Sequence, residues 1–203
     1  MRMRLIATLI VLLFAAPALS AGDPQSGKAL SAVCGACHGQ DGNTAISPDY
    51  PNLAGQNEIY LTRQLEMIKS NERNAPLMAG QLANYSAQQL ADLAAYYAGL
   101  PGKVGAAANE NLALGERIYR GGILAKGVAA CSACHSPTGR GIAVAGFPRV
   151  SGQAFDYMVV QLKAYREGER ATDEAYNGMM RAVAANMTDG EIRAVANYIR
   201  GLH

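Results

Sequence analysis

The chain has 203 residues, of which half are apolar, with 18 basic and 16 acidic side chains. This length allows one large domain or two domains of about 100 residues each. The balanced charge gives no basic surface, which argues against a nucleic-acid-binding protein. There is no Trp and there are only three Phe, so either a buried cofactor or a core rich in Ala and Leu must replace the usual aromatic bulk.

The N-terminus has the pattern of a secretory signal. Arg2 and Arg4 precede an apolar run over 5–16, and small residues at 18–20 form a cleavage site. The apolar run is shorter than the roughly 20 residues needed to span a bilayer, so a retained membrane anchor is the weaker alternative. We predict a signal peptide over 1–20, cleaved after Ser20, and a periplasmic protein. Cleavage of the signal peptide would reduce the 18 basic residues to 16, equal to the number of acidic ones.

A first domain is expected over 21–102. Asp23 and Pro24 have the pattern of an N-cap and first-turn proline for a helix over 25–33 that leads into the segment CGACH at 34–38. An amphipathic helix is predicted over 58–69. The last helix begins with the capping-box pattern that Ser86 and Gln89 provide.

A linker of small residues is predicted at 103–109, followed by a second domain over 110–203. The same order of elements returns there: a helix over 112–120, the segment CSACH at 131–135, and an amphipathic helix over 155–166. Thr188 and Glu191 then form the capping box of a final helix. No segment alternates as a β-strand does, so the predicted fold is all-α.

The two halves are a tandem repeat. With a shift of 97 residues, identical residues coincide, and after five additional residues in the second half the shift becomes 102. The coinciding pairs are Pro51 with Pro148, Gly55-Gln56 with Gly152-Gln153, Tyr60 with Tyr157, Gln64-Leu65 with Gln161-Leu162, and then Met78 with Met180, Tyr96 with Tyr198 and Leu100 with Leu202.

The four cysteines form two CxxCH motifs, which are typical of covalent haem attachment. Thiols at this spacing reach the two vinyl groups of one haem, and the following histidine lies beneath the iron. Two disulfides, a thioredoxin-like pair or a zinc site are the alternatives. The whole-domain repeat favours two haem c groups, attached at Cys34 and Cys37 and at Cys131 and Cys134.

The axial ligands follow from the residue count. His38 and His135 are the motif histidines, and the third histidine, His203, ends the chain, where we expect an exposed tail. The repeat assigns the second ligands to Met78 and Met180, expected in loops at equivalent positions. Met179 is an alternative to Met180, and packing in the core is the alternative role for any methionine.

The repeated prolines lie 13 residues after each motif histidine. Pro51 and Pro148 are candidates to supply a backbone carbonyl to the second ring nitrogen of His38 and His135. The alternative is that each proline only shapes a turn.

Taken together, these motifs resemble the class I cytochrome c fold twice, and the chain closely resembles the dihaem cytochrome c4 family. The resemblance rests on VCGACHG at 33–39, PNLAGQ at 51–56, YRGG at 119–122, GFP at 146–148, GQ at 152–153 and YIRGLH at 198–203. It implies two tandem cytochrome c domains related by a pseudo-twofold axis. It also implies His/Met-ligated haems with Met78 and Met180 as ligands, and the Pro51 and Pro148 carbonyls on the proximal histidines.

The resemblance further implies a monomeric periplasmic electron carrier rather than an enzyme. Family members take electrons from a quinol-oxidising bc complex or a dehydrogenase and pass them to a terminal oxidase. Peripheral membrane association is compatible with this role. Two alternatives stay open: a cytochrome subunit of a flavoprotein dehydrogenase such as sulfide dehydrogenase, and a dihaem peroxidase or gas sensor, which would need an open axial position.

Overall fold

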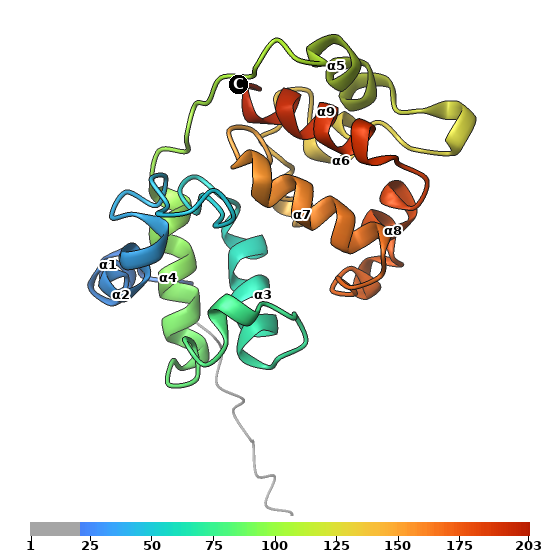
Figure 1. The fold of residues 1–203 in the computed structure, drawn as a ribbon. Coiled ribbons are helices and arrows are strands. Elements are labelled where there is room, and N and C mark those ends of the chain that lie inside the picture. Colours follow the sequence, from blue (N-terminus) through green and yellow to red (C-terminus); the bar gives the residue numbers. More distant parts are fainter. Residues whose placement is uncertain (1–20) are drawn as a thin grey trace, which may run out of the picture.

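The computed structural model describes residues 21–203, and the predicted signal peptide over 1–20 lies outside this range. The described chain consists of helices and loops with two isolated β-bridges, Ile123–Val128 and Ile142–Phe147. The predicted all-α fold is confirmed, with two helical domains joined by an extended segment at 101–108 (Figure 1). The α-helices are α1 (Pro24–Leu30), α2 (Ala32–His38), α3 (Glu58–Lys69) and α4 (Ala87–Gly99), then α5 (Leu112–Gly121), α6 (Ser132–His135), α7 (Phe155–Arg166), α8 (Met179–Ala184) and α9 (Asp189–Arg200).

Local sequence signals account for the starts of four helices, α1, α3, α4 and α9. The Asp23 carboxylate caps α1 by accepting from the backbone N–H groups of Gln25 and Ser26. The helix predicted over 25–33 is interrupted at Ser31, which ends α1 and precedes α2. The helices α3 and α7 have the predicted bounds, and both capping boxes form at the start of α4 and α9.

The first and last helices of each domain pack closely, α1 on α4 and α5 on α9. Glycine permits this approach. A Cβ atom at Gly27 would lie 2.0 Å from the backbone oxygen of Asp92, and one at Gly115 would lie 2.2 Å from that of Ala194. Any larger residue would therefore push the two helices apart.

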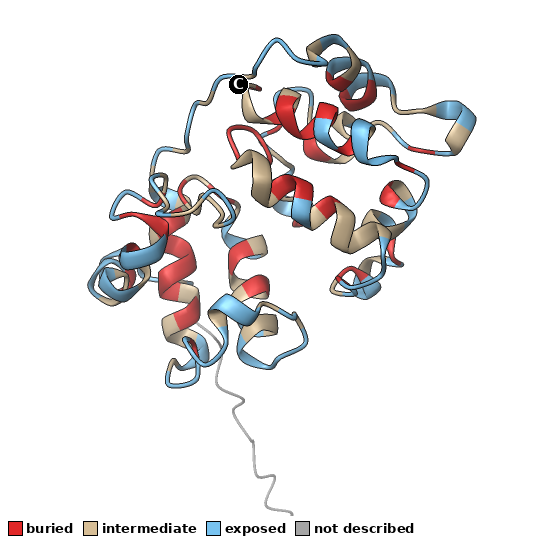
Figure 2. Cartoon of the chain, in the orientation of Figure 1, coloured by how far each residue is buried: buried red, intermediate tan, exposed pale blue. Residues whose placement is uncertain are grey.

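The two domains differ in the protein core that they build for themselves. The second domain has a continuous buried cluster that includes Ile118, Tyr119 and Ile192. The corresponding cluster of the first domain contains only Leu61, Leu93, Ala94 and Tyr97 as buried members. Buried residues are prominent in α4 of the first domain and in α7 and α9 of the second (Figure 2). The first domain therefore buries fewer apolar side chains against one another than the second.

The five additional residues of the second half help to join the domains. They lie after Arg170 and include part of the loop that carries Tyr176. The Arg63 guanidinium of α3 lies 4.4 Å from the centre of the Tyr176 ring and donates to its hydroxyl. Arg63 also donates to the Gly146 carbonyl across the interface, at 3.4 Å.

Candidate functional site

Each motif histidine is the last residue of a short helix, His38 in α2 and His135 in α6. Their Nδ1 atoms lie 3.0 Å and 2.9 Å from the carbonyl oxygens of Pro51 and Pro148. A carbonyl oxygen only accepts hydrogen bonds, so Nδ1 is the protonated nitrogen and the lone pair is on Nε2. Burial lowers the pKa of both histidines, and they are neutral at pH 7. Of the two roles considered for the prolines, the carbonyl acceptor is the one that the geometry supports.

Within residues 21–203 no disulfide joins the four cysteines, and each pair directly precedes its histidine in the chain. Burial raises the pKa of Cys34 and raises that of Cys131 to about 11, so these thiols are protonated at pH 7. Across residues 21–203 no three His, Cys, Asp or Glu side chains gather as a metal site. The zinc alternative therefore has no geometric support.

A single cavity of about 900 Å³ brings the predicted site residues together. It extends through both domains, and its walls are largely apolar, as in most cofactor sites. All eight predicted residues line it: Cys34, Cys37, His38, Met78, Cys131, Cys134, His135 and Met180.

The two predicted methionine ligands have different local structures. Met78 ends a 3₁₀ turn, Pro76–Met78, and is half-buried. Met180 lies in α8, so the expectation of a loop at this position is wrong. The buried Asp173, in the loop that contains the additional residues, accepts a bond of 3.0 Å from the backbone N–H of Arg181, which stabilises the first turn of this helix. Met180 packs against the second core, whereas Met179 is 37% exposed.

Two arginines that the sequence analysis did not single out also line the cavity, Arg73 and Arg170. They coincide at the shift of 97 residues. Each donates to a glutamine of its own domain and to a tyrosine and a glutamine of the other. The bonds run from Arg73 to Gln64 (2.9 Å), Tyr157 (3.0 Å) and Gln161 (3.4 Å), and from Arg170 to Gln161 (2.6 Å), Tyr60 (3.0 Å) and Gln64 (2.9 Å).

These guanidinium groups make the cavity suitable for an anionic cofactor. Among the described residues, neither arginine forms an ion pair with a carboxylate. Burial would raise the pKa of Tyr157, but Arg73 and Arg170 outweigh it and the pKa is lowered. A buried cation needs a partner, and a haem has two propionate groups. The thiols, the neutral histidines and this charge all fit haem c.

A helical chain that repeats this attachment site in two domains is a c-type cytochrome with two covalently bound haems. The family model described as Cytochrome c matches residues 24–100 and again 113–203. Cytochrome c4 of Pseudomonas aeruginosa is 46% identical over 98% of both chains. The chain therefore belongs to the cytochrome c4 family, whose members are dihaem electron carriers.

Two further comparisons extend this result. The crystal structure of reduced recombinant cytochrome c4 from Pseudomonas stutzeri superposes with a TM-score of 0.87 at 43% identity, covering 90% of this chain and 100% of that one. A thiosulfate dehydrogenase electron acceptor from Thiomonas intermedia is 38% identical over 98% of this chain and 89% of the relative. Within residues 21–203 no helix has the length and apolar character needed to cross a bilayer.

Proposed function

We propose that this chain is a diffusible electron carrier in which each haem iron is held between a histidine and a methionine. His38 and Met78 would ligate the iron of the first domain, and His135 and Met180 that of the second, with thioether bonds to Cys34 and Cys37 and to Cys131 and Cys134. The observation that carries the proposal is the pair of hydrogen bonds from Nδ1 to Pro51 and Pro148, because they leave each Nε2 available to a metal.

A bound haem supplies a one-electron redox centre. The thioether bonds would keep the cofactor attached outside the cell. The proline carbonyls orient each imidazole, and Met78 and Met180 would supply the second ligand of each iron. Such a ligand set would leave no site for a substrate on the iron, which favours electron transfer over a peroxidase or gas-sensing reaction.

The choice of Met180 over Met179 is supported by the repeat and by the packing of Met180 against the second core. The proposed test is optical. In Met78→Ala and in Met180→Ala we expect loss of one of two methionine–iron charge-transfer contributions and a lower reduction potential for that haem, because methionine ligation raises the potential. Met179→Ala is the matched control and should keep both. A wild-type protein without this absorption would refute the methionine ligation and favour an open iron.

We further propose that the chain is exported, is cleaved after Ser20, and works in the periplasm. A bc complex or a dehydrogenase would be the electron donor and a terminal oxidase the acceptor. The support is the signal-like pattern at 1–20 and the family membership. N-terminal sequencing of the periplasmic protein tests the cleavage site, and a mature protein beginning elsewhere would correct it.

A second candidate role is that of dedicated acceptor for one dehydrogenase. The relative named as a thiosulfate dehydrogenase electron acceptor favours this role over the bc complex as donor. Purification from the native cells distinguishes the two. Co-elution with a dehydrogenase would support the dedicated acceptor, whereas a monomer that the bc complex reduces rapidly would support the diffusible carrier.

A further inference from the structure

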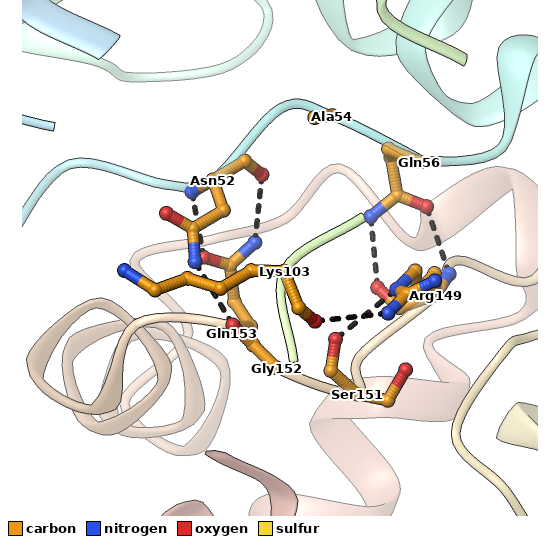
Figure 3. Close-up of a pocket in the computed structure, with 8 residues that line it drawn as sticks. All are labelled: Asn52, Ala54, Gln56, Lys103, Arg149, Ser151, Gly152 and Gln153. Atoms are coloured by element: carbon orange, nitrogen blue, oxygen red, sulfur yellow. Dashed lines mark hydrogen bonds between the residues drawn. The ribbon is translucent and has the colours of Figure 1, made fainter. Parts of the chain in front are cut away.

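Two buried glutamines cross the domain interface and bind the backbone of the opposite domain (Figure 3). The amide of Gln153 accepts from the backbone N–H of Asn52 at 2.7 Å and donates to the Asn52 carbonyl at 2.9 Å. In the same way, Gln56 accepts from the N–H of Arg149 and donates to its carbonyl, both at 2.8 Å. Asn52 coincides with Arg149, and Gln56 with Gln153, at the shift of 97 residues.

The orientation of each side-chain amide follows from its donors. The Oε1 atom of Gln153 also accepts from the N–H of Ala154 at 2.8 Å, and that of Gln56 accepts from Asn57 at 2.8 Å. Two N–H groups converge on one atom, so this atom is oxygen. Gln56 and Gln153 are only 8% and 7% exposed, which shields these bonds from water.

The bonded N–H groups belong to the same peptide units that hold the histidines. The peptide joining Pro51 to Asn52 accepts from His38 on its oxygen and donates to Gln153 from its nitrogen. The peptide joining Pro148 to Arg149 accepts from His135 and donates to Gln56. One hydrogen-bonded chain therefore runs from each histidine, through a single peptide, to a glutamine of the other domain.

We propose that Gln153 tunes the haem of the first domain and Gln56 that of the second, so that each domain adjusts the reduction potential of the other. Hydrogen bonds in such a chain strengthen one another by about 10–30% per bond. A bond to the peptide N–H makes the proline carbonyl a stronger acceptor. The histidine then becomes a stronger electron donor to the iron, which favours the oxidised state and lowers the potential. This inference rests on the histidine ligation proposed above.

The structure offers a matched control at the same contact. The side chain of Asn52 donates from Nδ2 to the Gly152 carbonyl at 2.9 Å. Asn52→Ala would remove this interdomain bond but keep the backbone N–H that Gln153 binds. It separates weakening of the interface from loss of the chain of bonds to His38.

The test is a spectroelectrochemical titration of the intact dihaem protein as wild type, Gln153→Leu, Gln56→Leu and Asn52→Ala. The two one-electron transitions of the titration are assigned to the two domains by finding which of them shifts in Met78→Ala and which in Met180→Ala. In Gln153→Leu we expect about a threefold rise in the reduced-to-oxidised ratio of the first-domain haem at fixed potential, which is about 28 mV at 59 mV per tenfold. In Gln56→Leu the second haem should shift instead, and Asn52→Ala should shift neither.

A second readout follows the histidine directly. In the reduced protein, the Nδ1 proton resonance of His38 should move upfield in Gln153→Leu while that of His135 stays in place. Equal shifts of both haems, a shift confined to the haem on the side of the mutated residue, or an effect of Asn52→Ala equal to that of Gln153→Leu would overturn the proposal. Unchanged potentials with the methionine absorption intact would reject this inference and leave the ligand set standing. If the wild type lacks that absorption, the proposed methionine ligation is refuted. The shift of the His38 resonance in Gln153→Leu then tests the hydrogen-bonded chain on its own.

Discussion

Replacement of Gly115 by alanine should destabilise the second domain. The new Cβ atom would lie 2.2 Å from the Ala194 backbone oxygen, where contacts shorter than 3.0 Å are essentially never seen, so α5 and α9 would have to separate by about 0.8 Å. Overpacking of this kind costs about 1–3 kcal/mol. Because the obstacle is backbone rather than a flexible side chain, we expect a cost of about 3 kcal/mol. Alanine recovers about 1 kcal/mol through its helix propensity, which leaves a net loss of about 2 kcal/mol.

Gly121 provides the control within the same helix. No atom lies within 4 Å of a Cβ built there, so Gly121→Ala should be neutral or stabilising by up to about 1 kcal/mol. The assay is thermal unfolding of the dihaem protein followed by far-ultraviolet circular dichroism. A loss of about 2 kcal/mol should lower the Tm of the second domain by roughly 10 °C. If the Gly115→Ala and Gly121→Ala proteins were equally stable, the close helix crossing could not be what requires glycine.

Three further predictions concern single side chains. Ala154 precedes α7 without a side-chain cap, whereas Asn57 caps α3. In a urea titration, Ala154→Asn should therefore raise the free energy of unfolding by about 1 kcal/mol. A decrease would contradict the capping role. Arg170→Met removes the guanidinium that donates to both Gln161 and Gln64. It should lower the free energy of unfolding by at least about 1–3 kcal/mol in the same measurement. An unchanged free energy of unfolding would show that water replaces the guanidinium. Burial would raise the pKa of Glu191, but Lys126 and Thr188 outweigh it and the pKa lies below its usual 4.5. The stability from Glu191 is therefore present above pH 4.5 and lost as the pH falls through the lowered pKa. Glu191→Gln should weaken the dependence of the unfolding free energy on pH below 4.5, and an unchanged pH profile would refute this.

The sequence predicts the elements whose signals are local. The bounds of α3 and α7 and both capping boxes follow from helical periodicity and from residue types at fixed spacing. The break at Ser31 and the helix at Met180 were not predicted. The first turn of the helix at Met180 is stabilised by Asp173, whose carboxylate accepts from the backbone N–H of Arg181, and this contact comes from a loop with no periodic pattern.

The interface residues were harder to predict than the attachment motifs. The repeat had already paired Gln56 with Gln153 and Tyr60 with Tyr157, and extending it would have paired Arg73 with Arg170. A repeat indicates that two residues have equivalent environments, but it does not reveal that the domains face each other through them. That information lies in contacts between residues about 100 positions apart, such as the bond from Gln153 to Asn52.

The cavity shared by the two domains has a consequence for how the protein matures. Residues of both halves of the chain line this one cavity. A chain carrying only one haem would retain an open, apolar space beside the occupied site, and a void of that kind costs stability in proportion to its size. We therefore expect that failure to attach a haem at one CxxCH motif lowers the stability of the other half of the chain as well.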